Sequence, residues 1–451
     1  MKRDTIIRNK THENGFRSVY QHISSTEPKI SIYLYCNVGS AMEPPSLRGV
    51  AHFIEHMCFK GTPTHPNPRD FLHIFDSTGA YFNAFTTQRY TVYVVQCHSH
   101  DLAQILYTLS DGVLNSSFSP TEYKKEIKVV VEESIRLLDD NDDQSDIIIN
   151  KMLYAGTPFE YPVDWYEYHT SPESEIMNRQ KVLAFYKKWY HPQNMVLSVS
   201  GNLSYKQFEH ALRGTFFMRK QTTCGVRAEL YGLYTPPRSG GAAQYKITPI
   251  KVPKTSYVSI GFRTCTYNSP DKYVLDFLAE LLSGFFSSKL YSTLRDDNGL
   301  TYFSKTFTEN YECGGEFVLY AISDVDKLLH NGTNKKPGVI PIIISVLREI
   351  KANGPTAAEM RLTKMHIQRS RELVKLSDEC AIYNGEYLTM HPEEDAVVVP
   401  YQDVYAKYFA DITSTQVRDI ARKYFIQENM CVCVLGKGVI QQDIERICCK
   451  I

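Results

Sequence analysis

The chain has 451 residues, of which 43% are hydrophobic and 22% are charged, a composition typical of globular proteins. This length exceeds what one hydrophobic core usually serves, so at least two domains are expected. The 50 basic and 50 acidic residues cancel, which argues against a protein that coats nucleic acid. No run of 18 or more apolar residues is present, so membrane insertion is not expected.

The first residues of the chain and its cysteines indicate the cellular compartment of the protein. The first residues lack the apolar stretch of a signal peptide and the arginine-rich arm of a transit peptide. The 11 cysteines are scattered without a CxxC pair, which is typical of reduced, buried thiols. These features predict a cytoplasmic protein. Residues 6–24 are expected to form two strands joined by an Asn14-Gly15 turn.

Further along, the chain shows two halves with a similar order of elements. The first half, residues 1–220, is predicted to contain a strand, a helix, the hairpin AYFNAFTTQRYTVYVVQC and two more helices. Residues 221–245 are dense in Gly, Pro, Ser and Thr and are interpreted as a linker. The second half, residues 246–451, repeats the order, including a Pro-Thr pair before a long helix. We predict an α+β fold of two homologous domains, each with helices on a mostly antiparallel sheet.

The sequence HFIEH in the first half places two of the 14 histidines four positions apart. The apolar rhythm of residues 47–61 predicts a helix that stops at Gly61. On a helix, His52 and His56 share one face and can bind one metal ion. Glu55 would lie beside that ion, directed so that it can reach a bound water. A catalytic zinc keeps three protein ligands and one position for water, so a third ligand must come from elsewhere.

The helix predicted after residue 118 offers carboxylates for this third position. It contains Glu126, Glu132 and Glu133 in an otherwise apolar stretch, and buried carboxylates are costly unless they are paired or bound to a metal. Glu126 and Glu133 are two helical turns apart on one face, whereas Glu132 is rotated by about 100° from Glu133. The alternative is that HFIEH is a surface turn and the glutamates are a solvated stripe. Two histidines together with these acids argue against that alternative.

With FKGT after the second histidine, this combination resembles the inverted-motif zinc metallopeptidases of the pitrilysin/insulinase family. The resemblance extends over nearly the whole chain, through NVGSAMEP, GAYFNAFTTQRYTVY, YHPQNMVLSVSGN and GFFSSKLYSTLRDDNGLTY. It implies one Zn²⁺ per chain, bound by His52, His56 and Glu133 in a catalytic N-terminal domain. It also implies that Glu55 is the general base and that Glu126 orients the site.

The resemblance also implies substrate-binding residues. Asn83 and Ala84 would lie in a strand at a sheet edge, where a peptide adds as an extra strand through main-chain bonds. Arg295 and Tyr302, in the second half, would bind the substrate backbone and the developing oxyanion. Without the resemblance, the default interpretation of the latter pair is a surface ion pair and a core phenol. Asn83 would equally suit an ordinary hairpin arm.

The prediction that follows is a zinc endopeptidase or oligopeptidase that hydrolyses unfolded peptides in a closed chamber. The chain has about half the length of the single-chain insulinase-like enzymes, so a homodimer is expected to complete the chamber. The alternative is a non-catalytic or processing-peptidase-type subunit of a larger assembly on the same fold. The Arg-Tyr pair argues against the processing-peptidase alternative, because the catalytic subunits of those enzymes lack it. The short prokaryotic-type peptidases are the better match.

Overall fold

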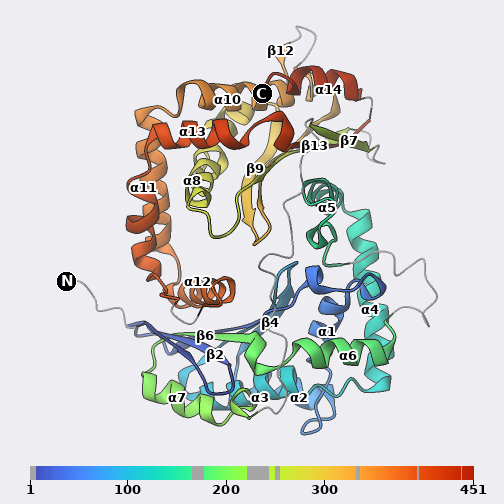
Figure 1. The fold of residues 1–451 in the computed structure, drawn as a ribbon, viewed down its shortest axis with the longest axis vertical. Helices are drawn as coiled ribbons and strands as arrows, with labels where there is room; N and C mark the ends of the chain where they lie inside the picture. The colour runs from blue at the N-terminus through green and yellow to red at the C-terminus, as the bar shows by residue number, and fades with distance from the viewer. Residues whose placement is uncertain are drawn as a thin grey trace. The chain divides into compact units, whose positions relative to one another are not determined.

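The computed structural model shows two compact units (Figure 1). It describes residues 7–164, 177–220, 243–248, 254–331, 336–393, 396–437 and 439–451. Unit 1 comprises Met1–Arg136, Tyr161–Glu229 and Val374–Tyr401. Unit 2 comprises Leu137–Glu160, Leu230–Leu373 and Gln402–Ile451. Most of the predicted linker, residues 221–242, lies outside the described residues.

Unit 1 is built on a six-stranded sheet with the order β1-β2-β6-β3-β5-β4. The strands are β1 (Ile7–Thr11), β2 (Arg17–His22), β3 (Lys29–Cys36), β4 (Tyr81–Thr86), β5 (Thr91–His98) and β6 (Met195–Gly201). Only the β2–β6 pair is parallel; the other neighbours are antiparallel. The inner strands β3 and β6 are almost entirely buried, whereas the edge strand β4 alternates between exposed and half-buried residues. The open edge of β4 therefore lies beside the helix that carries HFIEH, at Val50–Met57.

The helices of unit 1 cover both faces of this sheet (Figure 1). They are α1 (Val50–Met57), α2 (Pro68–Ser77), α3 (Leu102–Leu114), α4 (Pro120–Asp139), α6 (Arg179–Trp189), α7 (Tyr205–Arg213) and α12 (Leu376–Met390). The α4 helix begins as its sequence predicts, because the Ser119 hydroxyl accepts a bond from the Glu122 backbone N–H at 3.4 Å. It runs past Glu133 to Asp139, as expected.

Unit 2 contains a five-stranded sheet with the order β7-β13-β8-β10-β9. Its strands are β7 (Gln244–Thr248), β8 (Thr255–Thr264), β9 (Thr301–Asn310), β10 (Gly315–Asp324) and β13 (Met430–Leu435). A small ribbon pairs β11 (His330–Asn331) with β12 (Lys336–Pro337). The helices are α5 (Asn141–Leu153), α8 (Asp271–Ser283), α9 (Lys289–Ser292), α10 (Val339–Asn353), α11 (Ala357–Leu373), α13 (Ser414–Tyr424) and α14 (Gln441–Cys448).

Apart from the additional edge strand β1 of unit 1, the two sheets share one topology, which confirms the predicted α+β fold with two similar domains. In each, a single parallel pair, β2–β6 or β7–β13, is followed by three antiparallel neighbours. The last two strands in each order, β5–β4 and β10–β9, form an antiparallel hairpin with one strand at the sheet edge. By this correspondence β9 of unit 2 matches the edge strand β4 of unit 1.

The units differ from the contiguous domains 1–220 and 246–451 because the halves exchange two helices. The α5 helix, from the first half, packs on β8 and β13 of unit 2. The hydroxyls of Ser145 and Ser259 lie 2.8 Å apart there. Arg263 donates to the carbonyls of Met152 and Leu153, both at 2.8 Å, and so satisfies carbonyls that the end of α5 leaves open.

The reciprocal helix is α12, which comes from the second half and packs on β3 and β6 of unit 1. Asp378, in its first turn, accepts from Lys29 at 2.6 Å, from Gln96 at 3.0 Å and from the Ser31 hydroxyl. Asn384 donates to the buried side chain of Gln21 at 2.7 Å. Each half of the sequence therefore supplies a helix to the core of the other unit.

One predicted boundary is wrong, since α1 ends at Met57 and not at Gly61. Tight turns follow the helix, with the N–H of Phe59 bonded to His56 O at 3.2 Å. Gly61 has φ +101°, and a Cβ there would lie 2.7 Å from the Pro66 carbonyl oxygen. The glycine is therefore required where the chain reverses after those turns.

Two expectations about the whole chain concern its helices and its cysteines. Within the described residues, none of the helices has both the length and the apolar character to cross a bilayer. The cysteines of that part of the chain are all free thiols, and Cys449 is the one that is exposed. This agrees with the expected reduced, buried cysteines.

Candidate metal centre and catalytic residues

The start of the α1 helix is fixed by the buried carboxylate of Glu43. This carboxylate accepts the backbone N–H groups of Gly49 at 2.7 Å and Ala51 at 2.8 Å. Helix starts leave such donors without intrahelical partners. Gly49 has φ +82°, a left-handed conformation that glycine adopts without strain. Burial raises the pKa of Glu43 to about 8 despite the two bonds. HFIEH therefore begins from a fixed backbone position.

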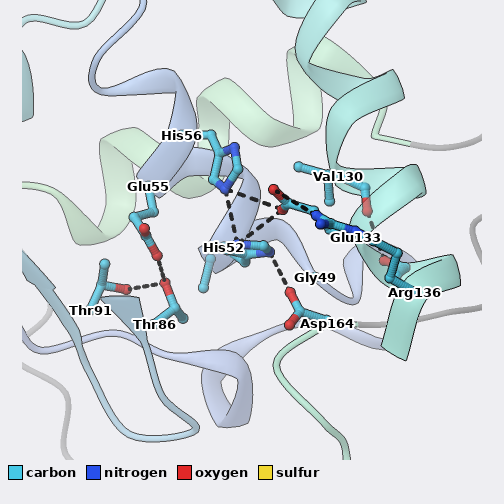
Figure 2. Close-up of polar contacts among 12 residues, drawn as sticks. Gly49, His52, Glu55, His56, Thr86, Thr91, Val130, Glu133, Arg136 and Asp164 are labelled. Atoms are coloured by element: carbon cyan, nitrogen blue, oxygen red, sulfur yellow. Dashed lines mark hydrogen bonds and ion pairs between the residues drawn. The ribbon is translucent and has the colours of Figure 1, made fainter. Parts of the chain in front are cut away.

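His52, His56 and Glu133 converge on one point (Figure 2). The two Nε2 atoms lie 3.0 Å apart, and Glu133 Oε2 lies 3.8 Å from His52 Nε2 and 3.6 Å from His56 Nε2. Zn²⁺ with bonds of about 2.0–2.1 Å in a tetrahedron separates its ligand atoms by about 3.3 Å. The observed separations bracket that value, so this donor set fits zinc. Among the described residues, no other group of three or more His, Cys, Asp or Glu side chains converges in this way.

The other nitrogen of each histidine faces a carboxylate. Glu126 Oε1 lies 2.7 Å from His56 Nδ1, and its Oε2 lies 2.7 Å from Lys60 Nζ. Asp164 Oδ1 lies 2.5 Å from His52 Nδ1. With both Nδ1 atoms engaged, the Nε2 atoms are left to face Glu133 and a metal ion. Burial alone would raise the pKa of Glu126, but His56 and Lys60 lower it below the ordinary value.

The charges around His52 favour its protonated form when no cation is bound. Burial lowers the pKa of His52, but the contact with Asp164 and the charges of Asp164, Glu55 and Glu133 raise it to about 9. A metal ion must displace that proton, so metal binding releases protons and weakens as the pH falls.

Glu55 lies between the two histidines in sequence and points toward strand β4 (Figure 2). The residue is 7% exposed, and Oε2 accepts a bond from the Thr86 hydroxyl at 2.6 Å. Burial raises the pKa of Glu55, while the charge of His52 and the bond from Thr86 lower it; the net shift is upward. A carboxylate with a raised pKa is suited to accept and return a proton near neutral pH.

The register of α4 separates the two adjacent glutamates. Glu133 lies in the cluster, whereas Glu132 is exposed. Glu133 also lies 3.8 Å from Arg136, whose side chain is largely exposed. Glu126 and Glu133 thus face α1 from one side of the helix, two turns apart.

Asn83 and Ala84 lie on the edge strand β4, as expected. The Ala84 N–H donates to Asn83 Oδ1 at 2.9 Å and not to β5, so the Ala84 backbone faces the open edge of the sheet. The Asn83 amide in turn donates to the Tyr81 hydroxyl at 3.0 Å. In a strand, the N–H and C=O of one residue point to the same side. Ala84 therefore presents both groups where an added strand would pair.

Arg295 and Tyr302 meet in unit 2. Arg295 Nη1 donates to the Tyr291 hydroxyl at 2.6 Å and to the carbonyl oxygen of Tyr302 at 3.3 Å. Tyr302 is 74% exposed, so it is not the core phenol of the default interpretation. The pair belongs to unit 2, whereas the histidine and glutamate cluster belongs to unit 1.

Three residues around the cluster were not predicted from sequence: Lys60, Thr86 and Asp164. The sequence could have indicated Lys60, because it lies four positions after His56. It could also have indicated Thr86, which belongs to the predicted edge hairpin. No sequence pattern indicates Asp164, since it lies in an irregular segment to which neither helical nor strand periodicity applies.

Two repeated α+β units, one of which presents HFIEH on a helix beside a sheet edge, define the fold class of the inverted-motif metallopeptidases. The chain belongs to the M16 family, which includes insulinase. The model described as Insulinase (Peptidase family M16) matches residues 19–162, and the model described as Peptidase M16 inactive domain matches residues 177–366. All the candidate metal ligands lie in the first matched region.

Relatives and solved structures agree with this assignment. The uncharacterized zinc protease YmxG of Bacillus subtilis is 27% identical over 367 residues, which cover 81% of this chain and 83% of YmxG. An uncharacterized zinc protease of Rickettsia bellii is 30% identical over 300 residues, which cover 66% and 69% of the two chains. The crystal structure of a protease from Helicobacter pylori has a TM-score of 0.82 at 19% identity, covering 96% of this chain and 100% of that chain.

Proposed function

We propose that the chain is a zinc-dependent endopeptidase or oligopeptidase that hydrolyses unfolded peptides. The observation that carries the proposal is the convergence of His52 Nε2, His56 Nε2 and Glu133 Oε2, with Glu55 buried beside them. Relatives named as zinc proteases support it at the level of the family. When bound, zinc would polarise the substrate carbonyl and lower the pKa of a water molecule from about 15.7 to roughly 7.

The side chains then have separate tasks. Glu55 accepts the proton of the attacking water and passes it to the departing amine, so no covalent intermediate with the protein is needed. Thr86 occupies Glu55 Oε2, which leaves Oε1 to take the proton. Glu126 holds the imidazole of His56 through Nδ1.

The edge strand β4 is the proposed binding place for the peptide. Ala84 presents its N–H and C=O at the open edge, and Asn83 accepts that N–H until a peptide replaces it. Pairing through the main chain predicts broad sequence tolerance. It also predicts that flexible peptides are cleaved, whereas folded proteins, which cannot offer an extended segment, are not.

A second copy of the chain is proposed to complete the site. The structural match to the periplasmic protease PqqL from Escherichia coli covers 98% of this chain but 49% of the PqqL chain, with a TM-score of 0.75. A homodimer would supply the matching half, with Arg295 and Tyr302 acting on a peptide held by the partner. The free cysteines support a reducing, cytoplasm-like compartment for this enzyme.

The test combines metal analysis with a quenched-fluorescent peptide library. The purified chain should hold about one zinc per chain, cleave flexible peptides and lose activity with 1,10-phenanthroline until zinc is restored. His52→Ala should lose zinc and activity. Glu55→Gln should keep zinc but lose turnover by about 10²-fold to 10⁴-fold or more. A zinc-loaded wild-type dimer that cleaves no peptide would instead support the non-catalytic subunit.

A further inference from the structure

We propose that Asp164 is a positioning residue that holds His52 in the orientation needed to bind the metal; the proposal rests on the metal centre of the proposed function. Asp164 Oδ1 lies 2.5 Å from His52 Nδ1. Both atoms are buried from solvent and have no further hydrogen-bond partner among the described residues. Buried polar atoms without partners are costly, so each compensates the desolvation of the other.

The contact has a counterpart on the second histidine. Glu126 approaches Nδ1 of His56 at 2.7 Å, just as Asp164 approaches Nδ1 of His52. A carboxylate at Nδ1 keeps the proton on that nitrogen and leaves the lone pair on Nε2 for the metal. The two carboxylates thus select the same tautomer of both rings, and both Nε2 atoms face Glu133.

Asp164 reaches the centre from a different part of the chain than Glu126 does. It lies in the segment that follows the return of the chain to unit 1 at Tyr161. The guanidinium of Arg48 lies 3.7 Å from the centre of the Tyr161 ring, and the Ser40 hydroxyl donates to the Tyr161 carbonyl at 3.5 Å. Arg48 directly precedes Gly49, the N-cap residue of α1. The segment with Asp164 is therefore anchored to the chain that leads into the helix carrying His52.

The geometry assigns Asp164 to positioning and not to ligation. Its carboxylate contacts Nδ1, whereas the converging ligand atoms are Nε2 of both histidines and Oε2 of Glu133. Figure 2 shows the contact between Asp164 and His52 and the contact between Glu133 and His52 as separate approaches to the ring. Substitution of Asp164 should therefore let the His52 ring move, although it removes none of the three metal-ligand residues.

The test measures zinc affinity by competition with a chromophoric chelator on the full-length protein. Asp164→Ala should bind zinc roughly 10-fold to 100-fold more weakly, Asp164→Asn should fall between Asp164→Ala and wild type, and Glu126→Gln should resemble Asp164→Ala. The matched control is Glu132→Gln, on the exposed side of α4, which should bind zinc as wild type does. The visible absorption of the Co²⁺-substituted Asp164→Ala protein should change in intensity or position, because the His52 ring is no longer held.

Two outcomes would overturn the proposal. One is a wild-type zinc affinity and Co²⁺ spectrum in Asp164→Ala. The other is a metal-free Asp164→Ala protein that is already unfolded at the assay temperature, while Asp164→Asn folds and binds zinc as tightly as wild type; the zinc loss in Asp164→Ala would then follow from general unfolding. Failure of the peptidase function is distinguishable from both. If the wild-type chain binds zinc but cleaves no peptide, the peptidase function is refuted, whereas the zinc affinities of the variants still test the role of Asp164. If the wild-type chain binds no zinc, both proposals are refuted.

Discussion

The hydroxyl of Thr86 should set the pH at which the general base becomes active. Thr86 Oγ1 donates to Glu55 Oε2 at 2.6 Å, and Glu55 is buried, so water cannot replace the bond freely. Thr86→Val removes this donor while keeping the shape of the side chain. The bond stabilises the ionised form of Glu55, so its loss favours the protonated form and raises the pKa of Glu55.

The size of the shift follows from the strength of one such bond. A hydrogen bond to a charged group contributes about 1.5–3 kcal/mol. Since 1.36 kcal/mol corresponds to one pKa unit, the pKa of Glu55 should rise by roughly 1–2 units. A base works only when it is deprotonated. The acidic limb of the profile of kcat/KM against pH should therefore move to higher pH by about that amount, while the plateau above it changes less.

The assay is hydrolysis of a quenched-fluorescent peptide by zinc-loaded protein between about pH 5 and pH 9. Thr91→Val is the matched control. The Thr91 hydroxyl lies 3.4 Å from the Thr86 hydroxyl and donates to the Val38 carbonyl at 2.9 Å, so this substitution removes a hydroxyl beside Thr86 but keeps the Thr86 donor to Glu55. It should lower stability without moving the acidic limb. An acidic limb that stays in place in Thr86→Val, with activity reduced equally at every pH, would refute the reasoning.

Three other predictions test the register, the dimer and the exchanged helix. Glu126→Gln should bind zinc roughly 10-fold to 100-fold more weakly than Glu132→Gln in chelator competition, and the reverse order would contradict the placement of Glu126 at His56. Homodimers of Glu55→Gln and of Arg295→Ala should each be nearly inactive, whereas a doubly tagged mixed dimer should regain measurable activity; a confirmed heterodimer without activity would exclude action in trans. Asp378→Ala should lower the free energy of unfolding in urea by roughly 2–3 kcal/mol, because three donors on unit 1 lose their acceptor; a change below about 0.5 kcal/mol would show that these bonds do not hold α12.

The parts that the sequence predicted are those governed by local periodicity. The four-residue spacing of His52 and His56 and the two-turn spacing of Glu126 and Glu133 are properties of a helix, so they could be placed without knowing the fold. The start of α4 at Ser119 and Pro120 follows from capping chemistry, which is equally local.

The parts that escaped prediction depend on contacts between distant segments. The sequence of α12 shows that it can form a helix, but nothing in it says that Asp378 will meet Lys29 on the sheet of the other half. Asp164 is another example, because it follows no repeating pattern and lies three residues after Tyr161, which contacts the distant residues Arg48 and Ser40. The end of α1 was misplaced since a glycine can terminate the turns after a helix as well as the helix itself.

The path of the chain gives the metal a role in stability that reaches beyond unit 1. The chain leaves unit 1 after Arg136, just past Glu133, and returns at Tyr161, just before Asp164; the segment between them carries α5, which packs on the sheet of unit 2. An ion bound by Glu133 and His52 would therefore hold both ends of this segment, because Glu133 lies just before it and Asp164, just after it, contacts His52. By thermodynamic linkage, if the packing of α5 on unit 2 strengthens zinc binding, then zinc binding stabilises the packing of α5 by the same free energy. Removing the metal should then make the peptide bonds near Leu137 and Glu160 more accessible to an added protease, although neither residue belongs to the site.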